Sequence, residues 1–596
     1  MSTNSRDTII DRFQQHRHVR PAAPGYFEKI GSAWVPTYWE EYIAQVRAAA
    51  RSMMALGVEP GNVVCMLGFN RPEWVIGQLA AMMIGGVGAG IYTTNSPSEV
   101  KYILNHSEAP LVILENENQW NKVKEIGGEL SHLRRAILMR GTSIDDPMAL
   151  TWEAFMACGA ETAEEELDAR IAAIEMEQLA SLIYTSGTTG PPKAVMLSHH
   201  NLASTARTGQ ALFNLTHNEV LLSYLPLSHI AEQMFTVHTA ATVGYGVYFA
   251  ESLTQLPDNL REVQPTIFFG VPSVWERFRN RVAERLGEAH GARRRIADWA
   301  QTIGRQVTEA RNHGQEPSGT LAAQYRLANK LVFSKVKPLL GFSRTRVAVS
   351  GAAAINKDIL EFFGGLDVTI YEVYGQSEGC GPTTFNRPGA TRFGATGQAW
   401  PGSEVKLAPD GEVVMRGPNV FMGYFKDPAA TQDTLIDGWL HSGDLGQFDE
   451  EGFLTIVGRK KDIIITSGGK NIAPRNIEAA LKNVSLVGDA VLVGEGRKYL
   501  CALLTLDPEA ALRFAETNGL EGENLHENPM VIEAVQTEID KLVNAQFARV
   551  EQVRKFTLLP RPFTVEGGEM TPTLKLKRKV ICDMHLDEIE AMYADE

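Results

Sequence analysis

The amino-acid sequence predicts an α/β protein: a large N-terminal domain of parallel-rich sheets with helices on both faces, followed by a small α+β C-terminal domain. Three observations predict this fold class. Apolar runs of strand length alternate with helix-length amphipathic segments up to residue 458, as βαβ units require. The chain has 596 residues, more than one ordinary core accommodates. Residues 459–596 form a shorter mixture of both patterns, so we expect the domains 1–458 and 459–596.

The first expected helix begins at Thr37, which stands in capping-box spacing with Glu40, and ends at Gly57. The residues from Trp74 to Tyr92 are apolar enough to suggest a membrane span, but the glycines within them predict a buried helix, a turn and a strand. The other expected strands are 63–67, 110–114, 180–183, 194–197, 220–224, 245–249, 266–269, 346–349, 368–370, 463–466, 490–493 and 500–506, with helices at 72–84, 98–105 and 474–481.

Composition restricts the class of protein. Apolar residues make up 44% of the chain and charged residues 21%, which excludes disorder as the main state. A formal net charge of −14 argues against a general nucleic-acid binder, although a local basic pocket stays open. The five cysteines are scattered without paired spacing, and the N-terminus lacks a secretory pattern. We therefore expect a cytoplasmic protein.

A phosphate-binding loop is predicted between residues 184 and 193, in the run Tyr-Thr-Ser-Gly-Thr-Thr-Gly-Pro-Pro-Lys. Its glycines let backbone N–H groups approach anionic oxygens, its hydroxyls donate, and Lys193 adds a charge. A flexible surface loop is the alternative, but apolar strands on both sides and two prolines argue against it. A Walker-type loop fails on spacing, because Gly187 and Gly190 are three apart and Ala194 follows the lysine.

Polar side chains also gather after the strand expected at 368–370. The run from Tyr371 to Glu378 combines aromatic rings, a glycine, a hydroxyl and a carboxylate. An aromatic ring can stack on a purine, and a carboxylate near a triphosphate can hold Mg²⁺. An ordinary strand-end turn is the alternative. The small residues from Ser350 to Ala354 have two similar interpretations, a flat surface for a base or a simple turn.

Two segments with turn signals carry a carboxylate and a guanidinium. Asp444 ends the run His-Ser-Gly-Asp, and Arg459 precedes Lys-Lys-Asp. A carboxylate can accept both hydroxyls of a ribose, and a guanidinium can donate to the same sugar or to phosphate. An isolated aspartate in a turn is more often a cap, which stays open as the alternative.

These motifs resemble those of the adenylate-forming superfamily of acyl-CoA synthetases, luciferases and peptide-synthetase adenylation domains. The run from Tyr374 to Glu378 matches the family pattern Tyr-Gly-x-Thr-Glu with a serine for the threonine, whereas Ala194 replaces the usual glycine after the loop lysine. The run from Thr571 to Arg578 keeps the spacing of the family's Thr-x-Ser-Gly-Lys-x-x-Arg, and its Thr-Leu resembles the long-chain fatty acyl variant. Without that resemblance, this lysine-rich run is a solvated surface.

The acyl-site motif of long-chain and very-long-chain synthetases, including the bubblegum-type branch, resembles residues 225–233, Leu-Pro-Leu-Ser-His-Ile-Ala-Glu-Gln. The resemblance places His229 beside a carboxylate channel. A histidine that follows a strand is otherwise a satisfied structural residue.

The resemblance implies a role for each matching residue. Lys575 is the expected mobile catalytic lysine, with Lys577 as the competing assignment. Glu378 and His229 join it in the catalytic group, Mg²⁺ is expected on Thr185 and Glu378, Lys461 is the expected hinge residue within 459–461, and Gly468 and Gly469 are expected beside coenzyme A. The expected ATP and AMP ligands are Thr185, Ser186, Gly187, Thr188, Thr189, Gly190, Lys193, Gly351, Ala352, Ala353, Tyr374 on adenine, Gly375, Ser377 on the α-phosphate, and Asp444 and Arg459 on ribose.

The activity that this resemblance implies is an ATP-dependent ligase that converts a long-chain fatty acid to acyl-CoA through acyl-AMP, releasing AMP and pyrophosphate. Its expected partners are the fatty acid, ATP with Mg²⁺ and coenzyme A, with no nucleic acid, in a monomer or homodimer. Three alternatives stay open. They are a fatty acyl-AMP ligase that serves a carrier protein, a CoA ligase for a medium-chain, aromatic or other carboxylate, and a non-catalytic nucleotide-binding scaffold.

Helices rich in arginine are expected between residues 272 and 337, with Trp275, Phe278 and Trp299 among the arginines. A solvated helical face whose arginines pair with nearby glutamates is one interpretation. A membrane-surface patch on an enzyme that collects fatty acids from lipid is the other. Under this second interpretation, the protein is expected in the cytoplasm with a peripheral contact at the inner membrane surface.

Overall fold

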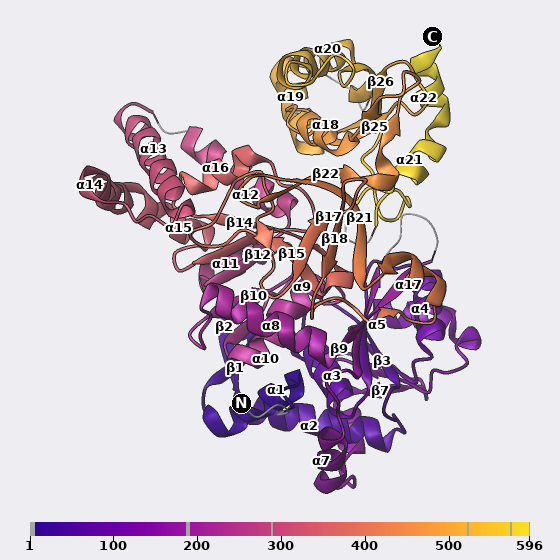
Figure 1. Ribbon diagram of the computed structural model, residues 1–596. Helices are drawn as coiled ribbons and strands as arrows, with labels where there is room; N and C mark the ends of the chain where they lie inside the picture. The colour runs from indigo at the N-terminus through magenta and orange to yellow at the C-terminus, as the bar shows by residue number, and fades with distance from the viewer. Residues whose placement is uncertain (1–5, 186–190, 288–289, 521–523, 572–574, 595–596) are drawn as a thin grey trace.

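The structure is a computed structural model that describes residues 6–185, 191–287, 290–520, 524–571 and 575–594, with the backbone alone for 285–287. Its described residues form two large sheets, a smaller antiparallel sheet and a C-terminal domain, which is drawn in gold and yellow at the top of Figure 1. The expected fold class, a large α/β part and a smaller α+β part, is confirmed.

The first large sheet carries the predicted phosphate loop at one edge. Strands β8 and β9 pair antiparallel across that loop, while the strands from β8 to β7 are parallel. All five side chains of β3 are buried, as expected for a central strand of a parallel sheet. In order the strands are β19 (Gly423–Tyr424), β9 (Lys193–Ser198), β8 (Leu179–Thr185), β4 (Val87–Ile91), β3 (Val63–Leu67), β5 (Leu111–Leu114), β6 (Arg135–Leu138) and β7 (Ala149–Thr151).

The second large sheet has a parallel centre and antiparallel edges. Its parallel strands end at the cavity described below. In order the strands are β16 (Gln398–Ala399), β15 (Gly381–Phe385), β14 (Ile370–Gln376), β13 (Val347–Ser350), β12 (Ile267–Gly270), β10 (Val220–Ser223), β11 (Gly246–Phe249), β1 (Pro24–Ile30) and β2 (Ala33–Tyr38).

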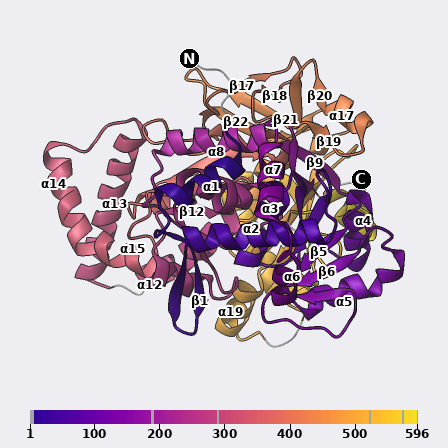
Figure 2. The ribbon, with the colours of Figure 1, turned by 90° about the horizontal axis from the view of Figure 1, so that it is seen from below.

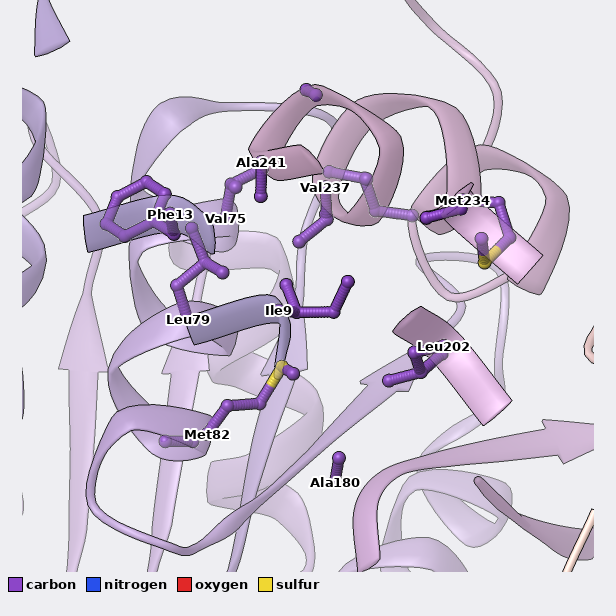
Figure 3. Packing of buried hydrophobic residues seen from close by; sticks show 14 of the residues in the cluster. Ile9, Phe13, Val75, Leu79, Met82, Ala180, Leu202, Met234, Val237 and Ala241 are labelled. Atoms are coloured by element: carbon purple, nitrogen blue, oxygen red, sulfur yellow. The ribbon is translucent and has the colours of Figure 1, made fainter. Parts of the chain in front are cut away.

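The main hydrophobic core lies between these sheets, around helices α1, α3, α8 and the π-helical turn Met234–Thr239. Figure 3 shows Ile9 of α1 among Val75, Leu79, Leu202 and Val237. The remaining helices cover the sheets and their edges. The helices of this part are α1 (Ile9–Val19), α2 (Trp39–Ala55), α3 (Pro72–Met83), α4 (Pro97–Ser107), α5 (Glu117–Glu125), α6 (Trp152–Cys158), α7 (Glu164–Ala172), α8 (His199–Phe213), α9 (Ile230–Gln233), α10 (Ala240–Val243), α11 (Leu256–Val263) and α16 (Lys357–Gly364).

A helical arm projects from the second sheet, at the left of Figure 1 and Figure 2. It has its own small core, in which Ala300, Ile303 and Val307 pack against Val332 and Phe333. The arm consists of α12 (Pro272–Gly287), α13 (Ala292–Asn312), α14 (Gly319–Ala328), a π-helical turn (Asn329–Phe333) and α15 (Ser334–Leu340).

The third sheet is antiparallel and connects the large sheets to the C-terminal domain. The sequence has turn signals at two of its segments, around Asp444 and Arg459, and predicts none of its other strands. It contains β17 (Glu404–Leu407), β18 (Glu412–Arg416), β21 (Trp439–Phe448), β20 (Leu435–Ile436) and β22 (Leu454–Arg459), with α17 (Pro428–Thr434) beside it.

The C-terminal domain packs helices on a three-stranded sheet around a separate core. The predicted helix at 474–481 and strand at 500–506 are confirmed. Its elements are β23 (Ile464–Ile465), β24 (Asn471–Ile472), α18 (Pro474–Leu481), β25 (Val487–Val493), β26 (Leu500–Leu506), α19 (Pro508–Asn518), α20 (Pro529–Glu538), β27 (Val553–Leu559), α21 (Arg578–Met584) and α22 (Leu586–Tyr593).

Three local predictions differ from the structure. Thr37 lies in β2, where it pairs with Tyr26, and α2 begins after Tyr38 without a side-chain cap, so the capping box is wrong. The strand expected at 368–370 is β14, which begins at Ile370 and contains most of the polar run itself. Asp444 lies inside β21 rather than in a turn.

The apolar stretch from Trp74 to Tyr92 forms α3, a turn and β4, all buried, as predicted. No helix among the described parts of the chain is long and apolar enough to cross a bilayer.

Candidate active site

A cavity of about 1150 Å³ lies outside the carboxyl ends of β12, β13 and β14, the usual position of a ligand site in an open α/β sheet. Its polar half is lined by residues of β8, β9, β14, β21 and β22 and by the C-terminal segment around Lys575. Its other half is an apolar branch between α8 and the second sheet. The structure thus gathers residues that lie nearly 400 positions apart, from Thr185 to Lys575.

The phosphate end of the cavity is built on the β8–β9 pair. Thr185 and Lys193 are cross-strand partners, and the Thr185 hydroxyl donates to the Lys193 carbonyl over 3.3 Å. Ser186, Gly187, Thr188, Thr189 and Gly190 lie outside the described residues. The strand pairing nevertheless holds both ends of the loop at the cavity.

Tyr424 connects the two predicted phosphate motifs, and sequence reasoning missed it. Its ring lies 4.7 Å from the Lys193 ammonium, and its hydroxyl donates to Glu378 Oε1 over 2.7 Å. Burial, and then the Glu378 carboxylate, raise the pKa of Tyr424, so the hydroxyl keeps its proton and donates. The Gly-Tyr pair of β19 has no motif of its own, and only the fold brings it here.

The residues that would hold Mg²⁺ fit a hard oxygen-binding cation. Thr185 and Glu378 both line the cavity and offer hydroxyl and carboxylate oxygens, the ligand types that Mg²⁺ takes. Tyr424 occupies Oε1 of Glu378, and no described side chain or backbone group donates to Oε2. That oxygen is therefore free to face a cation that accompanies phosphates.

The nucleotide end is shaped by backbone that approaches closely. A Cβ on Gly375 would lie 1.8 Å from the carbonyl oxygen of Gly381, so a side chain does not fit there. Ala352 lines the cavity with a φ of 68°, a left-handed conformation that costs energy for a residue with a side chain and that is found at functional sites. Ser377 also lines the cavity, whereas Gly351 and Ala353 are absent from its described lining.

Tyr374 contacts Asp444 at this end of the cavity, which sequence reasoning did not expect. Its hydroxyl donates to Asp444 Oδ2 over 2.8 Å, and its ring packs against Val413 and Leu454. Among the described residues that line the cavity, Gly375 appears and Tyr374 does not. In this conformation Tyr374 positions Asp444, and the predicted stacking on adenine has no direct support.

Asp444 and Arg459 form the predicted carboxylate–guanidinium pair. They face each other across β21 and β22, and Arg459 Nε donates to Asp444 Oδ1 over 3.0 Å. Both line the cavity, although Asp444 is 5% exposed and Arg459 is largely open to solvent. The antiparallel register, which sequence reasoning did not provide, sets this geometry.

Glu412 is a further polar residue that sequence reasoning missed. It accepts hydrogen bonds from His441 Nδ1 at 3.1 Å, the Gly443 N–H at 2.8 Å and Lys460 Nζ at 3.3 Å. Burial alone would raise its pKa, but these donors outweigh burial and lower it, so the carboxylate is ionised. Glu412 thus ties Lys460, next to the predicted hinge, to β21. Lys461 itself also lines the cavity.

Lys575 enters the cavity from the C-terminal domain. Its backbone N–H donates to the Thr571 hydroxyl over 3.1 Å, and the Thr571 N–H donates back to the Lys575 carbonyl over 2.8 Å. Lys577 is not among the described residues of the lining and instead precedes α21. Burial, then the charges of Arg459 and Arg475, lower the pKa of Lys575, although the residue as a whole is exposed.

The predicted coenzyme A residues lie elsewhere. Gly468 and Gly469 occupy the exposed turn between β23 and β24, and neither belongs to the described lining of the cavity.

His229 stands where the polar half meets the apolar branch. Its Nδ1 accepts the Ala231 N–H over 3.2 Å, so a neutral ring carries its proton on Nε2 and offers that donor. Burial, and then the Lys575 charge, lower the pKa of His229 to about 4, which keeps the ring neutral at physiological pH. Beyond it, the apolar branch is lined by Gly209, Phe213, Leu215, Met234, Phe235, Ile267, Phe269, Val347, Val349, Val373, Phe385 and Trp400.

Comparison with known proteins defines the class to which this fold and site belong. Residues 15–425 match the family model described as AMP-binding enzyme, and residues 461–596 match the model described as AMP-binding enzyme C-terminal domain. The chain belongs to the AMP-binding enzyme family, and the predicted resemblance to adenylate-forming enzymes is confirmed.

Curated relatives align along nearly the whole chain. The chain is 37% identical over 622 residues to the long-chain-fatty-acid–CoA ligase ACSBG2 of Xenopus laevis, covering 99% of this chain and 84% of that protein. It is 36% identical over 599 residues to the long-chain-fatty-acid–CoA ligase FadD15 of Mycobacterium bovis, covering 99% and 98%.

Solved structures share the fold at lower sequence identity. The A-PCP didomain of carboxylic acid reductase from Segniliparus rugosus, in complex with AMP, superposes with a TM-score of 0.73 at 19% identity, covering 100% of this chain and 83% of that one. ATP-bound MatB from Rhodopseudomonas palustris gives 0.69 at 20% identity, covering 98% and 99%.

Proposed function

We propose that this protein is an ATP-dependent ligase that converts a long-chain fatty acid to acyl-CoA through an acyl-AMP intermediate. The observation that carries the proposal is one cavity with two chemically distinct halves. A polar half with Lys193, Glu378 and Asp444 suits a nucleotide, and it opens into an apolar branch past His229. The names of relatives that align over 99% of the chain support the same substrate class.

The lining of the apolar branch supports an aliphatic acyl chain. Ile267 and Phe269 of β12 and Val347 and Val349 of β13 line it, so the branch runs along the faces of two neighbouring strands and not only past their ends. Gly209 and Phe213 of α8 line it as well. Every residue that we assign to the branch is apolar, which suits a chain of methylenes.

The first half-reaction joins acid and nucleotide. A carboxylate oxygen of the acid attacks the α-phosphorus of ATP, the bond between the α- and β-phosphates breaks, and pyrophosphate leaves. We assign the transition-state charge at the α-phosphate to Lys575 and the Ser377 hydroxyl, and the phosphates to Lys193 and the loop 185–190. Nε2 of His229 donates toward the acid carboxylate and orients it. Gly375 and Ala352 are the proposed surface for the base.

Mg²⁺ belongs to this proposal as a companion of the phosphates. Glu378 Oε2 and the Thr185 hydroxyl would hold it, and the cation would neutralise charge on the departing pyrophosphate. Asp444 and Arg459 are the proposed ribose partners, with Tyr374 holding the Asp444 carboxylate in place.

The second half-reaction transfers the acyl group to coenzyme A. The thiol sulfur attacks the acyl carbonyl, the bond from that carbon to the phosphate oxygen breaks, and AMP leaves. We propose that domain 459–596 rotates about Lys461 between the two steps. The rotation withdraws Lys575 and turns Gly468 and Gly469 toward the pantetheine arm. The proposal includes a monomer or homodimer that makes a peripheral contact with the inner membrane surface, where long-chain acids partition.

A panel of acids tests the substrate class. We expect ATP-dependent thioester formation with coenzyme A, with kcat/KM rising from octanoate to acids of about 14 to 16 carbons, in line with the free energy of burying each added methylene. Product that accumulates as acyl-AMP despite coenzyme A would favour an acyl-AMP ligase. A preference for benzoate over every fatty acid would contradict the assignment, and nucleotide binding without turnover of any acid would favour a scaffold.

A further inference from the structure

The chain has an unusual charge pattern from the second half of the helical arm through β13 to the start of α16. From Pro317 to Lys357 the chain contains seven lysines and arginines and no aspartate or glutamate, although the whole chain has a net charge of −14. A stretch of 41 residues without a carboxylate concentrates positive charge on one part of an acidic protein.

Some of these cations have structural partners. Lys337 pairs with Asp367 over 2.9 Å, and Arg346 pairs with Glu219. In contrast, no described carboxylate lies within ion-pair distance of Arg326, Lys330 or Lys335, and all three residues are exposed. These three charges are therefore free for a ligand outside the molecule.

Exposed leucines alternate with the free cations. Leu327 is 50% exposed, Leu331 38% and Leu339 56%, whereas Val332 and Phe333 of the same segment are buried in the core of the arm. The hydrophobic core of the arm therefore does not include these leucines. We call Arg326, Leu327, Lys330, Leu331, Lys335 and Leu339 the basic leucine face. Figures 1 and 2 both place α14 at the far end of the arm.

The aromatic residues of the arm do not belong to an outer surface. Trp275 is fully buried and Phe278 nearly so, in a core with Phe268 and Phe342. Arg294 pairs with Asp298 one turn later. The features that suggested a membrane patch between residues 272 and 300 are therefore partly structural. Arg277, Arg281, Arg293 and Arg295 are also exposed without a described ion pair, but they stand in a part of the arm that contains carboxylates, whereas the stretch after residue 317 has none.

We propose that the basic leucine face docks on an anionic lipid bilayer. Leucines inserted at the headgroup boundary remove apolar surface from water, and flexible lysine and arginine side chains reach the lipid phosphates beside them. A second copy of this chain fits less well, because a protein partner would have to match three unpaired cations with carboxylates while also covering the leucines. This inference rests on the proposed function, since it names the surface for the proposed membrane contact.

Vesicle binding without substrates tests the docking surface. Wild-type protein should sediment with phosphatidylcholine vesicles containing about 30% phosphatidylglycerol, weakly with neutral vesicles, and less as salt screens the headgroups. The double variant Leu327→Gln with Lys330→Gln should bind anionic vesicles about tenfold more weakly, since one cation near such a surface accounts for about fivefold and the lost leucine adds to it. The matched control is Leu512→Gln with Arg513→Gln on α19, which also removes one exposed leucine and one cation.

Five outcomes separate the alternatives. Equal loss in both double variants, or no binding by the wild type at low salt, overturns the docking surface. A wild-type dimer in light scattering that the Leu327 variant dissociates, with no vesicle binding, assigns the face to a second copy and also overturns it. Retained thioester formation from soluble decanoate, with vesicle binding lost, confirms that the variant is folded and supports the surface. Vesicle binding without any ligase activity contradicts the proposed function but supports the docking surface.

Discussion

Two carboxylic acids near the cavity are buried, and neither has a cationic partner among the described residues. Glu372 of β14 accepts the Gly394 N–H over 2.9 Å, and burial raises its pKa to about 8. Glu232 of α9 accepts from Ser223 and Thr236, each at 2.7 Å, and burial raises its pKa to about 7. Both side chains therefore carry a proton over much of the physiological range, each next in sequence to a residue of the cavity lining, Val373 and Ala231.

Replacing Glu372 tests this assignment through the pH dependence of stability. Between the unfolded pKa near 4.5 and the folded pKa near 8, the native state binds the extra proton, so wild-type stability falls as pH rises through this window. Glu372→Gln removes the ionisation and keeps an oxygen for the Gly394 N–H. We expect equal stability at about pH 5 and a gain on the order of 2 kcal/mol for the variant at about pH 8.

Denaturant unfolding at both pH values measures the difference. Glu361→Gln on the exposed face of α16 serves as the control and should show no growth with pH. If the gain of the Glu372 variant is the same at both pH values, burial of an ionisable carboxyl is not its cause.

The site residues that belong to local motifs could be predicted from the sequence. The site residues that the pairing register of distant strands brings together could not. Lys193 and Glu378 stand in runs whose residue types suggest phosphate and cation binding, whereas only the family resemblance pointed to Lys575, and all three line the cavity. Tyr424 and Glu412 belong to no such run, because distant strands bring them there. The antiparallel pairing of β21 with β22, and not a turn, aligns Asp444 with Arg459.

At the scale of elements, helix α8 forms one wall of the apolar branch. Gly209 lies in its last turns and lines the cavity, and the nearest atom to an added Cβ is Cη2 of Trp400 at 3.8 Å. A larger side chain at this position enters the branch without a backbone clash. The position offers direct control of the chain length that the branch accepts.

The variant Gly209→Leu should shorten the accepted acyl chain. Filling the branch next to Trp400 excludes distal methylenes, so kcat/KM for hexadecanoate should fall about tenfold or more while decanoate changes by about twofold at most. Ala211→Leu adds the same side chain on the exposed side of α8 and should leave both rates unchanged. A uniform loss for all acids in the Gly209 variant would contradict the assignment of the branch to the acyl chain.

The elements themselves show where sequence reasoning succeeds. Buried strands such as β3 and β26 are continuous apolar runs, and the sequence predicts them within a residue. In the third sheet, glycines and charged residues around Asp444 and Arg459 resemble turn signals, although both residues lie in strands. Thr37 fits a capping box by spacing, yet hairpin pairing with β1 holds it in a strand, because tertiary contacts override local preference.

At the scale of the whole molecule, the C-terminal domain supplies a cation to a cavity built by the rest of the chain. Among the described residues, polar side-chain contacts join it to the rest of the chain: Asn356 donates to Asn483 over 2.7 Å, Arg459 pairs with Asp444, and Lys460 pairs with Asp410 and Glu412. Such a polar contact between domains is compatible with movement. In the proposed mechanism this conformation serves adenylation, and the second half-reaction requires Lys575 to withdraw.

The most direct test separates the two half-reactions in the variant Lys575→Ala. We expect acid-dependent exchange between ATP and pyrophosphate to fall about 100-fold or more, because the removed ammonium stabilises charge that develops at the α-phosphate. Formation of acyl-CoA from supplied acyl-AMP should stay close to the wild-type rate, and Lys577→Ala should leave both reactions intact. Normal exchange in the Lys575 variant together with lost exchange in the Lys577 variant would contradict the account.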